Sequence, residues 1–164
     1  MQFSKTIASP VGVLTLVAGD AGLAAVLWDN DDPKRVRVGA LRAAPEHPIL
    51  VQAENELRAY FAGEHTVFSV PLAAAGTPFQ KKAWAALLTI PYGETRSYGE
   101  LARQIGNAKA ARAFGAANGR NPLSIVVPCH RAIASDGALT GFAGGLAAKR
   151  YLLSLETRVR KAAA

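Results

Sequence analysis

Hydrophobic and polar positions alternate, or gather in short apolar runs, over the first third of the chain. Residues 3–8, 11–18 and 23–28 form three such stretches, which Ser9-Pro10 and the turn at residues 19–22 separate. Period-two patterns bounded by glycine and proline are typical of β-strands joined by hairpins. The pattern therefore predicts an N-terminal sheet, with a loop at residues 29–33 after it.

After Pro48 the spacing of apolar residues changes to a helical period. The recurring positions are Ile49, Leu50, Ala53, Leu57, Tyr60 and Phe61, and Gly63 follows them. An amphipathic helix with this pattern buries one face, here against the sheet. A further strand is predicted at residues 66–70. We expect residues 1–75 to form an α/β scaffold domain.

Two capping-box patterns predict helix starts in the second half of the chain: Thr77 with Gln80, and Ser97 with Glu100. In a capping box each of the two side chains bonds the backbone N–H of the other residue. The first helix is expected to begin at residue 78 and the second to span residues 98–105. Glycine-containing turns follow, so the second half is predicted to be mainly helical.

A third helix is expected over residues 108–118, with Asn107 as its N-cap. Helix, turn and helix in succession is the pattern of a helix-turn-helix motif, although many helix pairs never touch DNA. Alanine and glycine dominate this third helix, so that only Lys109, Arg112 and Phe114 are expected to project from it. A slim helix can approach a nucleic-acid groove closely. A buried alanine-rich helix is an equally good interpretation of the same composition.

Charge divides the chain at the small-residue linker 72–76, and we place the domain boundary there, giving domains 1–75 and 76–164. The first carries six Lys and Arg against eight Asp and Glu, and the second thirteen against four, so the excess positive charge lies entirely in the second. Such asymmetry favours a polyanionic partner, with nucleic acid the first candidate. A merely soluble basic surface is the alternative.

A single cysteine, Cys129, excludes an internal disulfide, and no secretory signal pattern opens the chain. A reducing, cytoplasmic location is the expectation. No apolar run approaches the length of a membrane span. The three histidines are dispersed without ligand spacing, so we expect no metal and no cofactor.

The chemistry concentrates at residues 124–131, where an apolar run leads into Pro128, Cys129, His130 and Arg131. A lone cysteine is most often an inert core residue. The thiolate is the reactive form of cysteine, so a reactive Cys129 needs either a positive neighbour that lowers its pKa or a base that takes its proton. His130 is the candidate for this task. Glu156, in a predicted helix at residues 146–156, is the candidate to orient that imidazole. An exposed pairing of Glu156 with Lys149 or Arg158 is as plausible from the sequence.

A glycine-rich stretch at residues 140–145 surrounds Phe142 and follows a turn at residues 135–137. It lacks the spacing of a dinucleotide fingerprint. Glycines beside an aromatic ring let backbone amides approach a ligand edge.

Together these segments resemble the O6-alkylguanine-DNA alkyltransferases, the methylated-DNA-protein-cysteine methyltransferases. The similarity covers residues 77–156, through Pro128-Cys129-His130-Arg131, Asn121-Pro122, the 91–95 turn, Ser97-Tyr98, residues 110–113, Asn118-Gly119, residues 141–145 and the segment from Leu152 to Glu156. It implies an α+β fold: a small N-terminal β-sheet plus helix domain, followed by a mainly helical, winged helix-turn-helix-like domain.

The resemblance also implies roles. Cys129 accepts an alkyl group from O6 of guanine once and irreversibly, His130 activates the thiol through a water, Glu156 orients His130, and Asn121 supports the turn. O4-alkylthymine is a poorer substrate. Double-stranded DNA is the partner, entered through the minor groove by a helix whose contact residues are Arg112, Ala113, Ala116, Ala117 and Gly119, with Tyr98 on the adjoining phosphate. The base pocket is formed by Pro128, Arg131, Phe142, Ala143 and Gly144.

Two departures limit the transfer of these roles. Phe142 and Ala143 stand where many relatives have Tyr and Ser, and the N-terminal zinc ligands of some relatives are absent. The alternatives are a DNA-binding module or alkylation sensor without repair transfer, and a Cys-His hydrolase that turns over. We expect a monomer in solution that binds no membrane; the sequence leaves cooperativity on DNA open.

Overall fold

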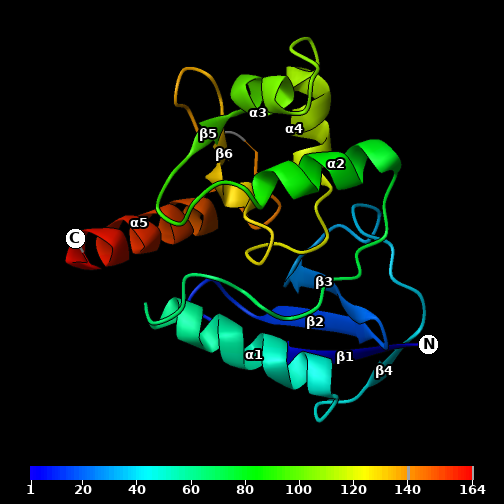
Figure 1. The fold of residues 1–164 in the computed structure, drawn as a ribbon. Helices are drawn as coiled ribbons and strands as arrows, with labels where there is room; N and C mark the ends of the chain where they lie inside the picture. Colours follow the sequence, from blue (N-terminus) through cyan, green and yellow to red (C-terminus); the bar gives the residue numbers. More distant parts are fainter. Residues whose placement is uncertain (140, 164) are drawn as a thin grey trace. The chain divides into compact units, whose positions relative to one another are not determined.

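The computed structural model describes residues 1–139 and 141–163, and within it the chain forms two compact units. Unit 1 comprises Met1–Ala75 together with Pro122–Val126, and unit 2 comprises Gly76–Asn121 with Val127–Ala164 (Figure 1). The segment Pro122–Val126 departs from the division expected from the sequence. It packs in unit 1 because the Val26 N–H donates to the Pro122 carbonyl at 2.8 Å and the Trp28 indole donates to Ser124 Oγ at 3.0 Å.

Unit 1 contains a four-stranded sheet of β1 (Gln2–Ile7), β2 (Leu14–Gly19), β3 (Gly22–Trp28) and β4 (Leu41–Ala43). Its order is β3-β2-β1-β4, with the first three strands antiparallel and β4 parallel to β1. The three hairpin strands were predicted. β4 was not, since its three residues are all exposed and carry no alternating pattern.

The strand predicted at residues 66–70 was wrong. The chain there is irregular, and only beyond it does Leu72 form an isolated parallel bridge to Leu23. That contact is possible because Gly22 has no Cβ: one built there would lie 2.7 Å from the Pro71 carbonyl oxygen. Residues 71–73 therefore join β3 through close contact between backbones, and no alternation of side chains marks this contact in the sequence.

Helix α1 (Pro48–Phe61) covers one face of the sheet, as Figure 1 shows and as the helical spacing predicted. Its buried residues are Leu50, Ala53, Leu57 and Tyr60. The imidazole Nδ1 of His47 accepts from the Ile49 N–H at 3.2 Å and so caps the helix start. Burial of this apolar stripe gives the unit its core.

Unit 2 contains α2 (Pro78–Leu87), α3 (Tyr98–Gln104), α4 (Ala111–Gly119) and α5 (Leu146–Ala163), and α2, α3 and α4 pack on one another. Both predicted capping boxes are present, at Thr77 and at Ser97. Short strands β5 (Arg96–Ser97) and β6 (Ala132–Ile133) pair in parallel. Helix α5 continues well past Glu156, where the sequence analysis ended it.

The start of α4 differs from the prediction. Asn107 does not cap it, because its N–H donates back to the Ala102 carbonyl at 2.9 Å and closes the end of α3. Gly106, at φ +83°, makes that turn. Ala110 occupies the N-cap position without a side-chain bond. Phe114 was expected to project from α4, but it is fully buried.

A tryptophan fixes α4 to α2. The indole of Trp84 donates to the Ala117 carbonyl at 2.9 Å, in the last turns of α4. Gly76 lies under the same ring, since a Cβ there would be 2.5 Å from it. One face of α4 is therefore core and the other is open to solvent. Across the described residues no helix combines the length and apolarity needed to cross a membrane.

Candidate active site

The Pro-Cys-His-Arg stretch forms a single 3-10 turn, η1 (Cys129–Arg131), whose residues are all buried. Cys129 is 4% exposed and His130 fully buried. Asn121 Nδ2 donates to the Val127 carbonyl at 2.9 Å, a contact that lies two residues before the cysteine. The backbone can therefore present Cys129 in one fixed position.

Strain accompanies this turn. Ile125, four residues before Cys129, has φ +74°, in the left-handed region. A β-branched residue rarely adopts this conformation, and such outliers cluster at functional sites. Ser124 and Ile125 belong to the segment of unit 1 that precedes Cys129 in the chain, and Ser124 Oγ accepts there from the Trp28 indole.

His130 and Glu156 form a buried pair. Nε2 of the imidazole lies 2.6 Å from Oε2 of the carboxylate. Because an ionised carboxylate only accepts, Nε2 carries the proton and Nδ1 presents its lone pair. Among the described residues Nδ1 has no hydrogen-bond partner, so the imidazole is oriented to accept a proton there.

Burial determines the ionisation of His130. It lowers the pKa of the imidazole below its ordinary value of 6.5; Glu156 raises that pKa, and the charges of Arg131 and Lys149 lower it again. Burial raises the pKa of Glu156, because it disfavours the charged carboxylate. The hydrogen bonds and the positive charges of His130 and Arg131 outweigh this effect and hold the pKa of Glu156 far below 4.5. Near neutral pH we assign an ionised Glu156 and a neutral His130.

Arg131 lies behind this pair instead of facing a ligand. Its Nε donates to Glu156 Oε1 at 2.7 Å and its Nη2 to Oε2 at 3.1 Å. Its Nη1 donates to the Ile90 carbonyl at 2.8 Å, and only 7% of its surface is exposed. The expectation that Arg131 contacts the base is therefore not supported by its placement. The Gly93 N–H also donates to Glu156 Oε1, at 3.1 Å.

Lys149 is a charged residue at the site that the sequence analysis missed. Its side chain is fully buried, and Nζ donates to the Ala132 carbonyl at 2.8 Å, directly after η1. Burial lowers the pKa of this ammonium, and the charge of Cys129 opposes that change. No carboxylate within the described part of the chain pairs with it. The expected surface pairing of Lys149 with Glu156 does not form.

The glycine-rich loop carries an aromatic ring towards this lysine. The half-buried Phe142 has its ring centroid 6.0 Å from Lys149 Nζ. The Gly145 N–H bonds the Phe142 carbonyl at 2.8 Å, with Gly145 at φ +89°. Ala143 is exposed and Gly144 half-buried, while Pro128 is buried at the start of η1. Thr140, the first residue of the predicted loop, lies outside the described residues.

Most of the predicted DNA-contact residues lie on the open face of α4. Arg112, Ala113, Ala116 and Gly119 are exposed, whereas Ala117 is 4% exposed and faces Trp84. Tyr98, the first residue of α3, is half-buried. Ala113 and Ala116 also line a shallow pocket of about 240 Å³, opposite Phe79 and Gln80 of α2. The two interpretations of the alanine-rich helix thus each describe one face.

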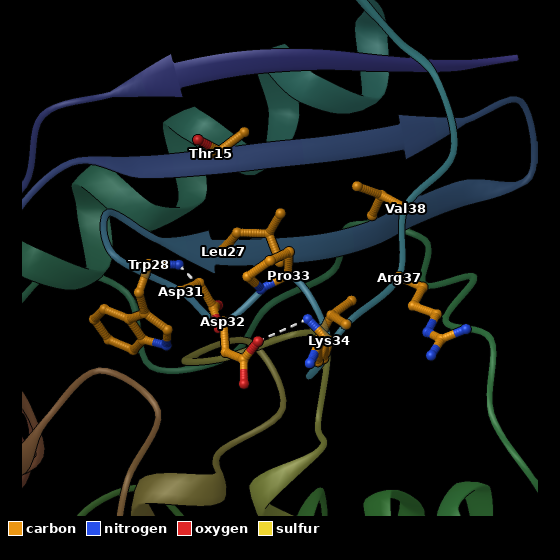
Figure 2. Close-up of a pocket in the computed structure, with 10 residues that line it drawn as sticks. Thr15, Leu27, Trp28, Asp31, Asp32, Pro33, Lys34, Arg37 and Val38 are labelled. Atoms are coloured by element: carbon orange, nitrogen blue, oxygen red, sulfur yellow. Dashed lines mark hydrogen bonds between the residues drawn. The ribbon is translucent and has the colours of Figure 1, made fainter.

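Unit 1 carries a larger pocket, of about 520 Å³, on the sheet face away from α1 (Figure 2). Thr15 and Leu27 form its floor, and the loop that follows β3 forms its rim. One acid in its lining, the half-buried Asp31, accepts from Arg35 at 2.6 Å and from the Trp28 N–H at 3.2 Å. The lining of this pocket contains no Cys, Ser or His, and no His, Cys, Asp or Glu cluster suited to a metal occurs in residues 1–139 and 141–163.

Comparison with known families covers both units. The family described as "6-O-methylguanine DNA methyltransferase, DNA binding domain" matches residues 78–158, and its "ribonuclease-like domain" matches residues 3–74. The chain belongs to the 6-O-methylguanine DNA methyltransferase family. The resemblance inferred from the sequence, and the α+β fold with it, are confirmed.

Individual relatives agree with this assignment. The methylated-DNA–protein-cysteine methyltransferase of Mycobacterium tuberculosis is 51% identical over 154 residues, covering 93% of this chain and 90% of that protein. That of Methanosarcina acetivorans is 49% identical, covering 90% and 94%. A crystal structure of M. tuberculosis OGT in complex with DNA has a TM-score of 0.88 at 48% identity, covering 96% and 94%. The activity of the chain is DNA repair by transfer of an alkyl group to a cysteine.

Proposed function

We propose that Cys129 is the alkyl acceptor, and that the chain removes alkyl groups from O6 of guanine in duplex DNA in one irreversible step. One observation carries this proposal: the sole cysteine adjoins a buried imidazole whose Nε2 is held by Glu156 and whose Nδ1 has no partner among the described residues. A nucleophile, a base and an orienting carboxylate are thereby assembled. O4-alkylthymine is a slower substrate in this proposal.

The transfer is a single displacement. The thiol proton passes through a water to His130 Nδ1, and the thiolate Sγ attacks the alkyl carbon. The S–C bond forms as the C–O6 bond breaks, and the electron pair stays on the guanine, which takes the proton back from His130 and is restored. The product is a thioether, from which no step in this sequence regenerates the thiol. Each molecule therefore reacts once.

Access to O6 requires the nucleotide to leave the base stack, because the atom lies inside the duplex. We assign the extrusion to Arg112, exposed near the start of α4, and to Tyr98, which begins α3. The exposed Ala113, Ala116 and Gly119 give α4 a slim surface that fits a minor groove. Ala117 supports this surface from beneath through Trp84.

The flipped base is proposed to lie beside Phe142, with the Ala143 and Gly144 amides directed to its edge and Pro128 bordering the pocket. Phenylalanine keeps a stacking face but cannot make a phenolic hydrogen bond. Because Cys129 must stay a thiol, the proposal fits a reducing, cytoplasmic location. The acceptor, base and orienting residues all belong to one unit, so a monomer is the proposed functional form.

The deciding experiment weighs the Cys129 peptide after incubation with duplex DNA that contains O6-methylguanine. A stoichiometric gain of one methylene mass, absent in Cys129→Ser, supports the proposal. Intact DNA binding with unchanged mass would identify a DNA-binding module or alkylation sensor instead. Repeated product release by one protein molecule would identify a Cys-His hydrolase.

A further inference from the structure

Two basic side chains share the single carboxylate of Glu156. His130 approaches Oε2 at 2.6 Å, while Arg131 bonds Oε1 at 2.7 Å and Oε2 at 3.1 Å. The carboxylate is 1% exposed, so solvent does not screen these contacts. The electrostatic state of the imidazole therefore depends on Arg131 as well as on burial and on Glu156.

Contact with an ionised carboxylate works against the neutral form of His130 that the base role requires. Opposite charge at hydrogen-bond distance favours the imidazolium form of a histidine. An imidazolium has no lone pair at Nδ1 and cannot accept the proton of Cys129. A second positive charge that competes for Glu156 and repels a proton from His130 adds to the effect of burial and so favours the base role proposed above.

The charged groups around His130 come from two elements, η1 and α5. Arg131 and Cys129 belong to η1, and Lys149 and Glu156 reach it from α5. Burial lowers the pKa of His130 most, and Arg131 and Lys149 add to that decrease. The ring of Tyr92 lies 5.5 Å from the Arg131 guanidinium carbon. Helix α2 also packs against η1, but its lysines Lys81 and Lys82 are exposed.

We propose that Arg131 is a positioning residue that divides the negative charge of Glu156 with His130, and so keeps the imidazole neutral and able to accept the Cys129 proton. This inference rests on the proposed role of His130 as base. It assigns to Arg131 an electrostatic task at the back of the site, in place of the base contact expected from the family resemblance.

The geometry makes Arg131 suited to this task. Its planar guanidinium bonds both carboxylate oxygens at once, which a lysine ammonium cannot reproduce. A third hydrogen bond, from Nη1 to the Ile90 carbonyl at 2.8 Å, holds the guanidinium group in this orientation. Because Nε2 of His130 is bonded to the same carboxylate, any movement of the Arg131 guanidinium changes the electrostatic environment of the imidazole.

The first test follows the titration of His130 by NMR in the full chain with ¹³C-labelled histidine, using His130→Gln to assign the signal among the three histidines. The wild-type imidazole is expected to be neutral at about neutral pH, and Arg131→Met to raise its midpoint by about one pH unit or more. Arg131→Lys is expected to give a smaller rise. A wild-type imidazolium at neutral pH would overturn the inference without any variant.

The second test measures single-turnover transfer from free O6-benzylguanine against pH. In Arg131→Met the fall in transfer rate on the acid side of the pH profile is expected to begin at a higher pH than in wild type. At high pH the rate is expected to recover to within a few-fold of wild type. Arg35→Met is the matched control, because Arg35 makes a similar two-bond contact with Asp31 in unit 1. It is expected to leave both profiles unchanged.

The two proposals fail differently. A purely structural Arg131 would reduce the rate equally at every pH and leave the His130 midpoint in place, which would overturn the present inference while the base role stands. Wild-type transfer by His130→Gln would instead overturn the base role itself.

Discussion

His130 Nε2 and Glu156 Oε2 lie 2.6 Å apart in the folded chain, although 26 positions separate the two residues in the sequence. One comes from a 3-10 turn and the other from the middle of α5, and both are buried. The contact therefore exists only when unit 2 is folded around it. Stability and reactivity of the site are linked through the same carboxylate.

Glu156→Gln is expected to destabilise the protein strongly. The substitution keeps the shape of the side chain but leaves Arg131 buried without its counter-charge, and breaking a buried pair in this way costs about 3–5 kcal/mol. The free energy of unfolding from urea titration measures the loss. Glu94→Gln is the control, because Glu94 pairs with Arg96 at 2.9 Å in a partly exposed position, where the expected change is about 1 kcal/mol or less. Equal losses in the two variants would refute the buried-charge argument.

The unfolding free energy is expected to fall in two steps as pH decreases. The folded-state pKa of His130 lies below 6.5, so the unfolded chain binds more protons and stability declines once pH falls below that value. The pKa of Glu156 is lowered from 4.5 by its cationic partners, against the effect of burial, so its contribution is complete above 4.5 and disappears below. Melting temperatures across this range test both steps. The lower step should shrink in Glu156→Gln.

Local patterns predicted much of unit 2 because they depend on a few neighbouring residues. The capping boxes at Thr77 and Ser97 are each specified within three positions, and both are present. The chain near β4 and at residues 66–70 was not predictable in this way. There the partners are distant in sequence and no local pattern marks them: β4 pairs with the backbone of β1, and the Ser69 and Val70 N–H groups donate to the Glu56 carboxylate.

The site followed the same division. Cys129 and His130 could be identified as a candidate pair because they are adjacent in the sequence. The burial of Lys149 was missed, although a signal for it existed: Lys149, Leu152 and Glu156 recur at helical spacing on one face of α5, which places two charged residues on an apolar stripe. Arg131 carried no such signal, since its partners lie in α5 and after α2.

Arg112→Ala is expected to impair repair of duplex DNA by at least about 10-fold, while reaction with free O6-benzylguanine changes little. Only the duplex requires a nucleotide to be extruded, at a cost of a few kcal/mol. Single-turnover rates with the two substrates give the comparison. Arg103→Ala, another exposed arginine in the helix pair, is the control for loss of charge. Equal losses of rate with both substrates would argue against the role of Arg112 in nucleotide extrusion.

DNA affinity is expected to fall steeply as salt increases. The excess positive charge lies entirely in residues 76–164, and each phosphate that it neutralises releases condensed counterions. Fluorescence anisotropy of an undamaged duplex over a salt series measures the slope of log affinity against log salt. Lys81→Ala and Lys82→Ala, on the exposed side of α2, report how far the footprint extends beyond α4. A flat response would contradict the electrostatic interface.

Lys149→Met is expected to slow transfer without unfolding the protein. The buried ammonium has no carboxylate partner among the described residues, and the thiolate of Cys129 is the negative charge that favours it. By the same coupling, removing the ammonium should raise the thiol pKa and slow transfer about 10-fold near neutral pH.

Stability should change by less than about 2 kcal/mol in this variant, because losing the bond to the Ala132 carbonyl is offset by no longer burying a charge. Thiolate absorbance against pH, read without DNA, measures the thiol directly. Lys161→Met is the control, since Lys161 is exposed on the same helix. A wild-type thiol titration in Lys149→Met would show that His130 and the backbone around η1 activate Cys129 without this charge.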